Sequence, residues 1–332
     1  MPARNKNTKK KRERPDQRKE HSKKLLLSFL GITLIILMIG VVVRLVISWN
    51  SRLWKDDLRI TFVVASNPPV LVSYQTHSSE VVFVPFPENL EIEGSYNVGK
   101  WHVQSLYEVG NQRGIRGDLL TRSVQYALSV PVDGWMDKQG LDLLGYSNVQ
   151  EIRESKDPSP YSLFRPLLSF GIDTNFSFFD RLQIARLLGG ARSRRVVLPE
   201  QKRLVKQIRR LDGSLGYELD QERVKEMALR EFRDTLLAQE QIGLGIINGT
   251  EKAGVGNSIA GVVSTMGSRV IWVRSEKVKI PIRCQLRATK EGQKTLIALR
   301  LATLLRCPLV SDSKASVPLE LVIGEELARE VP

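Results

Sequence analysis

Three arginines lie close together beside an amphipathic segment, and theirs is the most specific chemistry this sequence offers. Arg113, Arg116 and Arg122 belong to RGIRGDLLTR, and apolar residues at 119, 120, 124 and 128 predict a helix over 116–128. A planar guanidinium can hold phosphate through two hydrogen bonds, and the free amides at a helix start add to the attraction. These arginines are therefore candidate ligands of a pyrophosphate group. The alternative is a solvated helix start, because only Arg116 lies at the helix N-terminus.

Motifs for other common chemistries are missing from the sequence. It has no G-x-S-x-G and no P-loop, and its histidines, His21, His77 and His102, have no partners at metal-ligand spacing. We therefore expect no metal site and no catalytic residue of these kinds.

The first 48 residues predict a basic tail followed by a membrane-spanning helix. Residues 1–24 hold eleven Lys or Arg against three acidic residues, so we expect this tail to be disordered. Leu25–Val43 has no charge over 19 residues, and a helix over 25–48 has the length that a bilayer requires. The alternative is a cleaved signal peptide, whose apolar region would be shorter and would precede a small-residue cleavage site.

The distribution of charge predicts the orientation of this helix. Of the net charge of +14, the tail contributes +8 (eleven basic minus three acidic residues), which leaves +6 for the remainder. The excess of basic residues before the helix predicts a cytoplasmic tail and an extracytoplasmic remainder. Attraction to anionic lipid at the membrane surface accounts for the basic residues of the tail. We expect no nucleic-acid partner, because no DNA-reading helix accompanies the tail.

The exported part predicts an α/β fold with two domains, over 55–240 and 243–328. In the first domain the expected strands are 58–65, 70–74, 81–84 and 132–136, and the expected helices are 116–128, 178–188 and 221–238. Residues 151–161 predict an exposed connection, and 192–206 predict a strand at a charged edge. The second domain has the order β-α-β-β-α-β, at 243–250, 256–266, 269–273, 279–286, 291–305 and 319–326, which is typical of a two-layer domain.

The stretch VVFVPFPENLEIEG at 81–94 combines a strand-like run with a proline break. This pattern predicts a strand and a turn, with Phe86 and Pro87 at an exposed corner.

The C-terminal domain resembles the LytR C-terminal domain. The resemblance is carried by GIINGTEKAGVGNSIAGVVSTMGSRVIWVRSE, by KIPIRCQLRATKEGQKTLIALRLATLLRCPLV and by LELVIGEE. That domain typically has a strand into an Asn-Gly-Thr turn, a glycine-containing helix, a strand, a helix, and a final strand ending in Gly-acidic. Its frequent companion is the LytR-CpsA-Psr catalytic domain, which transfers glycopolymers from a polyprenyl pyrophosphate carrier to peptidoglycan outside a single N-terminal anchor.

Residues 59–136 resemble that catalytic domain. VVFVPFPENLEIEG is similar to its strand into a Pro-Arg-Asp turn, GKWHVQSLYEVG to its Gly-Lys-x-Lys-Ile-Asn-x-Ala-Tyr segment, and SVQYALSVPVDGWM to its helix into an Ile-Asp strand. The resemblance places Phe86 and Pro87 where the family has a substrate-binding Arg and an Asp. It places Pro69 where the family has an acidic residue that helps to hold a metal. Lys100 and Asp133 match the family pattern, and we expect Asp133 to be structural.

The departures from the family pattern at Phe86, Pro87 and Pro69 predict a membrane-anchored, extracytoplasmic relative that is not catalytic. Removing one electrostatic stabiliser commonly costs roughly 10²- to 10³-fold in rate, and several are missing here. The expected partners are the membrane and a lipid-linked glycopolymer, peptidoglycan or an envelope protein, with no cofactor. One alternative is an active glycopolymer transferase, in which Arg113, Arg116 or Arg122 replaces the lost arginine and Mg²⁺ is the cofactor. Another is a single-pass scaffold of the cell-division type.

The two cysteines, Cys284 and Cys307, are candidates for a disulfide. An oxidising exported compartment permits the bond, and the expected strand and following helix can bring the two residues within bridging distance. Two buried free thiols are the alternative.

Overall fold

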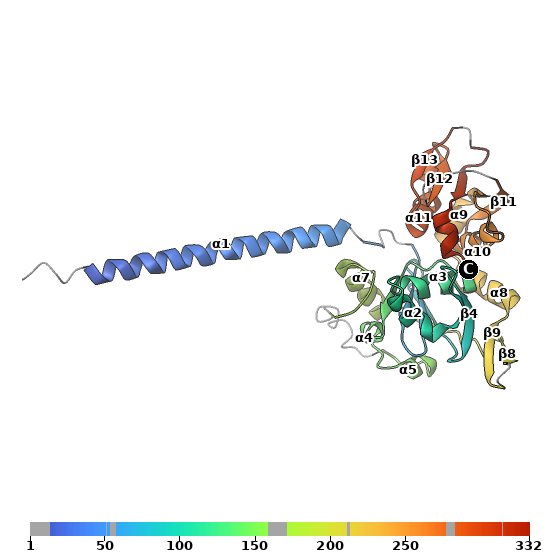
Figure 1. The fold of residues 1–332 in the computed structure, drawn as a ribbon, viewed down its shortest axis with the longest axis horizontal. Coiled ribbons are helices and arrows are strands. Elements are labelled where there is room, and N and C mark those ends of the chain that lie inside the picture. Colours follow the sequence, from blue (N-terminus) through green and yellow to red (C-terminus); the bar gives the residue numbers. More distant parts are fainter. Residues whose placement is uncertain are drawn as a thin grey trace, which may run out of the picture. The chain divides into compact units, whose positions relative to one another are not determined.

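The computed structural model describes residues 14–50, 52–53, 58–158, 171–210, 213–276, 283–313 and 315–332. The chain divides into two units, Met1–Arg52 and Leu53–Pro332 (Figure 1). Both sides of the expected domain boundary at 240–243 lie within the second unit, so the division there stays a prediction.

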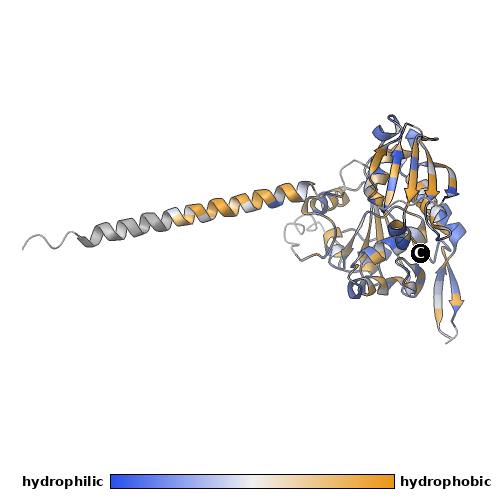
Figure 2. Cartoon of the chain, turned by 45° about the horizontal axis from the view of Figure 1, so that its top comes forward, coloured by the Kyte–Doolittle hydropathy of each residue, from blue (hydrophilic) through white to orange (hydrophobic). Residues whose placement is uncertain are grey.

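The first unit is the helix α1, Arg14–Asn50. Its apolar stretch, orange in Figure 2, has side chains such as Phe29 and Leu34 more than half exposed. The described residues contain one helix long and apolar enough to cross a membrane, Ser28–Trp49, judged by length and composition alone. The tail was expected to be disordered over 1–24, but its residues from Arg14 onward are helical because α1 begins there. Lys, Arg and Glu are good helix formers that can extend an existing helix. Residues 1–13 lie outside the described residues.

The first sheet of the second unit has the strand order β6-β1-β2-β3-β7. Its strands are β1 Ile60–Ala65, β2 Val70–Gln75, β3 Glu80–Pro85, β6 Gly134–Asp137 and β7 Ser193–Val196. The three central strands are antiparallel, while β6 and β7 run parallel to β1 and β3. The four strands expected over 58–136 are therefore confirmed. Of the strand expected over 192–206, residues 193–196 form β7 at an edge of this sheet, while residues 205–206 belong to a strand of another sheet. Strands β1 and β3 are mostly Val, Ile and Phe, and β2 begins Val-Leu-Val, because both faces of the sheet are buried.

Helices cover both faces of this sheet. One buried cluster joins alternate strand residues to α2 and α3, and a second cluster joins the intervening residues to α4, α5 and α7. The helices are α2 Leu106–Gln112, α3 Asp118–Leu128, α4 Gly140–Leu144, α5 Val149–Arg153 and α7 Phe178–Gly189, with the short helix η1 at Val103–Ser105. Residues 151–153 of the expected connection are thus helical, and 159–170 lie outside the described residues.

A second sheet, which the sequence analysis missed, has the order β5-β4-β9-β8. Its strands are β4 Leu90–Gly94, β5 Gly99–His102, β8 Val205–Arg209 and β9 Leu215–Leu219. The helix expected over 221–238 is two helices, α8 Gln221–Glu231 and α9 Thr235–Glu240. The break occurs at Asp234, whose carboxylate accepts hydrogen bonds from the amides of Leu236 and Leu237 and so starts a new helix.

The third sheet belongs to the C-terminal part and has the order β11-β10-β14-β12-β13. Its elements are β10 Gly243–Asn248, α10 Val255–Met266, β11 Arg269–Ser275, β12 Cys284–Ala288, η3 Gly292–Lys294, α11 Leu296–Leu305, β13 Leu309–Ser311, β14 Leu319–Ile323 and α12 Glu325–Glu330. The β-α-β-β-α-β order is present, with the extra strand β13. The last strand ends earlier than expected because α12 begins at Glu325. Of the strand expected over 279–286, residues 279–282 lie outside the described residues.

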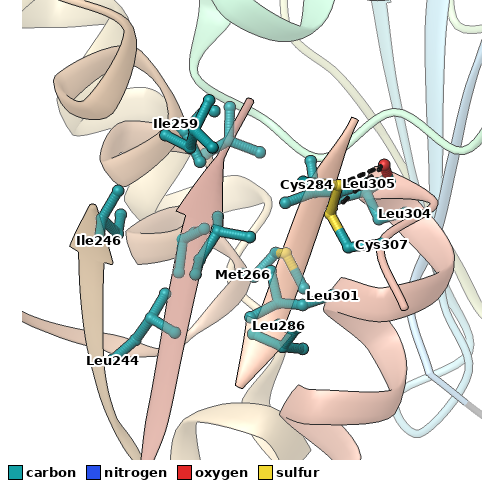
Figure 3. Close-up of a cluster of buried hydrophobic side chains, with 14 of the residues drawn as sticks. Leu244, Ile246, Ile259, Met266, Cys284, Leu286, Leu301, Leu304, Leu305 and Cys307 are labelled. Atoms are coloured by element: carbon teal, nitrogen blue, oxygen red, sulfur yellow. Dashed lines mark hydrogen bonds between the residues drawn. A yellow bond between two sulfur atoms is a disulfide. The ribbon is translucent and has the colours of Figure 1, made fainter. Parts of the chain in front are cut away.

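The two cysteines form a disulfide in the core of this part. Cys284 on β12 and Cys307, just after α11, are both buried, and their Cα atoms are 5.2 Å apart. Figure 3 shows the bond beside Leu304 and Leu305, in a cluster that includes Leu286 and Met266. The bridge ties the end of α11 to the sheet that the helix covers.

Candidate functional site

The three candidate phosphate-binding arginines lie in different environments. The Nη2 atom of Arg116 is 2.6 Å from Asp173 Oδ1. Arg122 is only 6% exposed, and its Nε atom is 3.3 Å from Glu330 Oε2. Arg113 follows the last residue of α2 and is exposed. A phosphate-binding role for the three stays a prediction, and for Arg122 it would require a buried ion pair to open.

The corner at the end of β3 is buried, so the expectation that Phe86 and Pro87 are exposed is wrong. Phe86 is 2% exposed and belongs to the buried cluster that includes Leu90 and Val197. Its amide donates to the carbonyl of Pro69, which is also buried. The proline does mark a turn, but the aromatic ring gains free energy by leaving water. The Phe86 side chain is therefore part of the buried core.

A cavity of about 490 Å³ opens beside this corner. Several segments that are distant in the sequence contribute to its wall: Asn67 and Pro68 after β1, Pro87, Glu88 and Asn89 after β3, Asn148, Val149, Gln150 and Arg153 at α5, Glu200, and Tyr217 on β9. Of the two positions that the resemblance assigns to substrate binding, Pro87 lines this cavity and Phe86 does not.

Arg153 is the arginine of this cavity, and the sequence analysis did not select it. Its Nη2 atom donates to the carbonyl oxygen of Phe86 at 2.9 Å and lies 3.3 Å from Glu200 Oε1. The helix that carries it is capped by Asn148, whose side-chain oxygen accepts from the amide of Glu151. An Asn followed by spaced apolar residues was the available signal for this short helix. Nothing in the local sequence indicates that Glu200 would be its partner.

The charges on the wall of the cavity do not favour an anion. Arg153 is the one basic residue among the lining residues, and Glu88 and Glu200 are acidic. Because Arg153 is already paired with Glu200, an incoming phosphate must compete with a carboxylate that is covalently part of the protein. Glu200 Oε2 is buried and has no hydrogen-bond partner among the residues that the structure describes.

The two residues that match the family pattern have partners elsewhere. Asp133 Oδ1 lies 2.6 Å from Arg300 Nη2, and Asp133 Oδ2 accepts from the amide of Thr61. Lys100 forms an ion pair with Glu218, and both line a second cavity of about 400 Å³. Asp133 thus lies in a buried structural pair, and Lys100 lines a different cavity from Pro87 and Arg153.

The described residues offer no ligand set for a metal ion. No group of three or more His, Cys, Asp or Glu side chains within them is arranged to hold one. Mg²⁺ prefers carboxylate and phosphate oxygens, and the acidic family position is Pro69 here. Mg²⁺ that is bound together with substrate phosphates needs only one or two carboxylates, so the Mg²⁺ of the transferase alternative stays a prediction.

Comparisons with known proteins give a limited likeness. No protein-family model matches the sequence, and no curated protein matches it. The solved structure described as "TagT bound to LIIa-WTA" has 12% sequence identity and a TM-score of 0.38, covering 53% of this chain and 92% of that chain. TagV from B. subtilis has 10% identity and a TM-score of 0.38, covering 52% and 95% of the two chains.

A third solved structure is the LytR-CPS2A-psr family protein YwtF (TagT) with bound octaprenyl pyrophosphate lipid. It has 12% identity and a TM-score of 0.36, and the match covers 53% of this chain and 91% of that chain. At these low values the likeness by itself assigns this chain neither a family nor an activity.

Proposed function

We propose that this chain is a single-pass membrane protein of the cell envelope, of LytR-CpsA-Psr type, that binds a wall glycopolymer or its lipid-linked precursor without transferring it. The sequence resemblance over 59–136 and in the C-terminal part supports the type. The apolar stretch Ser28–Trp49 supports the anchor. The basic tail supports an orientation with the second unit outside the cytoplasm.

The pairing of Arg153 with Glu200 is the observation that carries the proposal. Transfer of a phosphoryl-linked sugar needs cations at the oxygens where negative charge develops. In this cavity the one lining arginine is held by an internal carboxylate and by the carbonyl oxygen of Phe86. The family's Arg and Asp positions are Phe86 and Pro87, both buried. These contacts support binding over chemistry.

The nature of the ligand also belongs to the proposal. One solved neighbour is described with bound octaprenyl pyrophosphate lipid. For this chain we propose only the general ligand class, a lipid-linked glycopolymer. Two observations support it: the sequence resemblance to an envelope family, and a polar cavity of about 490 Å³. Envelope proteins remain a second class of proposed partner.

A transfer assay tests the proposal. The full chain in detergent would be incubated with a polyprenyl-pyrophosphate-linked disaccharide, Mg²⁺ and a peptidoglycan acceptor. We expect product formation no faster than without protein. Transfer that is lost in Arg153→Ala would overturn the proposal and establish the second candidate function, an active transferase. That candidate is favoured by a single observation, the presence of Arg153 in the cavity.

A further inference from the structure

We infer that the cavity beside Phe86 binds an uncharged sugar unit that carries an acetamido group, and that Glu200 sets this preference. This inference rests on the proposed function, because it names the part of the polymer that the cavity recognises. It follows from three features of the wall: its amide side chains, its internal ion pair, and a buried carboxylate oxygen without a partner.

Amide side chains dominate the polar wall of the cavity. They come from three segments of the sequence, which contribute Asn67, Asn89, and Asn148 with Gln150. An amide side chain offers both a donor and an acceptor, although Asn148 Oδ1 already accepts from the amide of Glu151. The remaining groups match the hydroxyl groups of a sugar and the N–H and C=O of an acetamido group. A phosphate group offers only acceptors and would leave the carbonyl ends of these amides facing its negative charge.

The internal ion pair selects against anions and does not oppose a neutral ligand. An anion must displace Glu200 from Arg153 or bind beside an intact pair whose charge is already balanced. It would also approach the carboxylate of Glu88. A hydroxyl group can instead accept from the remaining guanidinium donors and donate to a carboxylate, so Arg153 and Glu200 can bind it together.

Glu200 Oε2 provides a specific acceptor. The atom is buried without a hydrogen-bond partner among the described residues, although Glu200 lines the cavity. Buried acceptors are nearly always satisfied in native proteins. A ligand hydroxyl or acetamido N–H would satisfy it. A phosphate, fully ionised, has no proton to donate.

Tyr217 and the size of the cavity fit a ligand of this kind. The amide of Tyr217 donates to the carbonyl oxygen of Asn89, so an aromatic side chain is held next to one of the lining amides. An aromatic ring combines an apolar face with a polar tip, as a sugar ring does. The volume lies within the range of about 300–1,000 Å³ that is common for small-ligand pockets.

Calorimetric titration of the full chain in detergent tests the inference. The probes are the neutral trisaccharide of N-acetylglucosamine and inorganic pyrophosphate. We expect the wild-type chain to bind the trisaccharide and not pyrophosphate. Asn89→Ala should weaken trisaccharide binding about tenfold through loss of a donor and an acceptor. The exposed Gln112→Ala, outside the cavity wall, is the matched control and should bind like the wild type.

The variant Glu200→Gln tests the role of the internal carboxylate. It keeps the shape of the side chain and removes its charge, so pyrophosphate should now bind at least about tenfold more tightly, while trisaccharide binding weakens. Equal pyrophosphate binding by wild type and Glu200→Gln would overturn the role of Glu200. A thermal unfolding curve for each variant verifies that it is folded.

The outcomes separate this inference from the proposed function. Trisaccharide would be tested up to about 10 mM, which exceeds the dissociation constant of any useful binding. If neither the trisaccharide nor pyrophosphate binds, only the sugar inference is overturned. Pyrophosphate binding by the wild type that is lost in Arg153→Ala would overturn the sugar inference but not the proposed function, which only the transfer assay can overturn.

Discussion

Arg300 and Asp133 form a buried ion pair, with Nη2 and Oδ1 2.6 Å apart and each side chain only 7% exposed. Arg300 lies on α11 in the C-terminal part, and Asp133 precedes β6 of the first sheet. The same guanidinium donates to the carbonyl oxygen of Arg59. The pair therefore joins segments from both sides of the expected domain boundary, and it gives Asp133 a structural role, as the sequence analysis expected.

Breaking this pair should destabilise the protein strongly. In Arg300→Met the carboxylate of Asp133 stays buried without its cation, which should lower the free energy of unfolding by about 3–5 kcal/mol. Urea denaturation followed by tryptophan fluorescence would measure it. The matched control is Arg306→Met at the exposed residue that follows α11, which should cost about 1 kcal/mol or less. Equal losses of unfolding free energy in the two variants would show that the buried pair contributes no more to stability than an exposed pair.

The candidate arginines should differ in their effect on stability. Arg122→Ala removes one partner of buried Glu330, which also pairs with Arg283, so we expect a loss of about 2–3 kcal/mol. Arg113→Ala, at an exposed position, should change the unfolding free energy by less than about 0.5 kcal/mol. Thermal denaturation of both variants compares them. A stable Arg122→Ala would restore that residue as a candidate for ligand binding.

The disulfide should contribute measurably to stability. Cys284 and Cys307 are 23 residues apart, and a closed loop of this length restricts the unfolded chain by about 3 kcal/mol. The double variant Cys284→Ala/Cys307→Ala should therefore melt at a lower temperature, and a reductant should destabilise the wild type but not the variant. Alkylation of the unreduced, unfolded protein followed by mass spectrometry should find no free thiol. Two alkylated cysteines would refute the bridge.

Acid should weaken the contact between α8 and the edge strand β7. Burial by itself would raise the pKa of Glu231, but hydrogen bonds from Arg230 and Arg195 outweigh burial, and the pKa lies below its ordinary value of 4.5. A carboxyl with a lowered folded-state pKa stabilises the fold above its unfolded-state pKa. That stabilisation is lost as the pH falls below 4.5 through the folded-state value.

The variant Glu231→Gln tests this dependence. It should be less stable than the wild type by about 1–2 kcal/mol at pH 7, because charged hydrogen bonds are lost. Its stability should then fall less steeply on acidification below pH 4.5. Parallel stability curves for the two proteins, measured between neutral pH and pH 3, would contradict the assignment.

The elements that the sequence predicts best have a clear local pattern. Strands β1 and β3 are mostly Val, Ile and Phe, β2 begins Val-Leu-Val, and α3 has a clear apolar period, so local pattern is enough for them. The second sheet was missed because β8 (VKQIR) and β9 (LGYEL) mix polar and apolar residues over five positions. Such short strands become recognisable only from their pairing.

The candidate cavity could not be predicted from local sequence. Its wall combines Asn67, Gln150, Glu200 and Tyr217, which are far apart in the chain. The partner of Arg153 is fixed by tertiary packing, and so is the direction of Phe86. That Phe86 and Pro87 replace an Arg and an Asp is what the resemblance implies, and it stays a prediction. The structure adds that the cavity beside them holds an arginine paired with Glu200.

The most direct test of the central claim is whether the wild-type cavity binds a prenyl pyrophosphate. Thermal denaturation of the full chain in detergent would be measured with geranyl pyrophosphate and Mg²⁺, alongside Glu200→Gln and Arg153→Ala. A ligand at 100 times its dissociation constant adds about 2.7 kcal/mol to the folded state. The account predicts no stabilisation of the wild type and a clear stabilisation of Glu200→Gln. Stabilisation of the wild type that disappears in Arg153→Ala would contradict it.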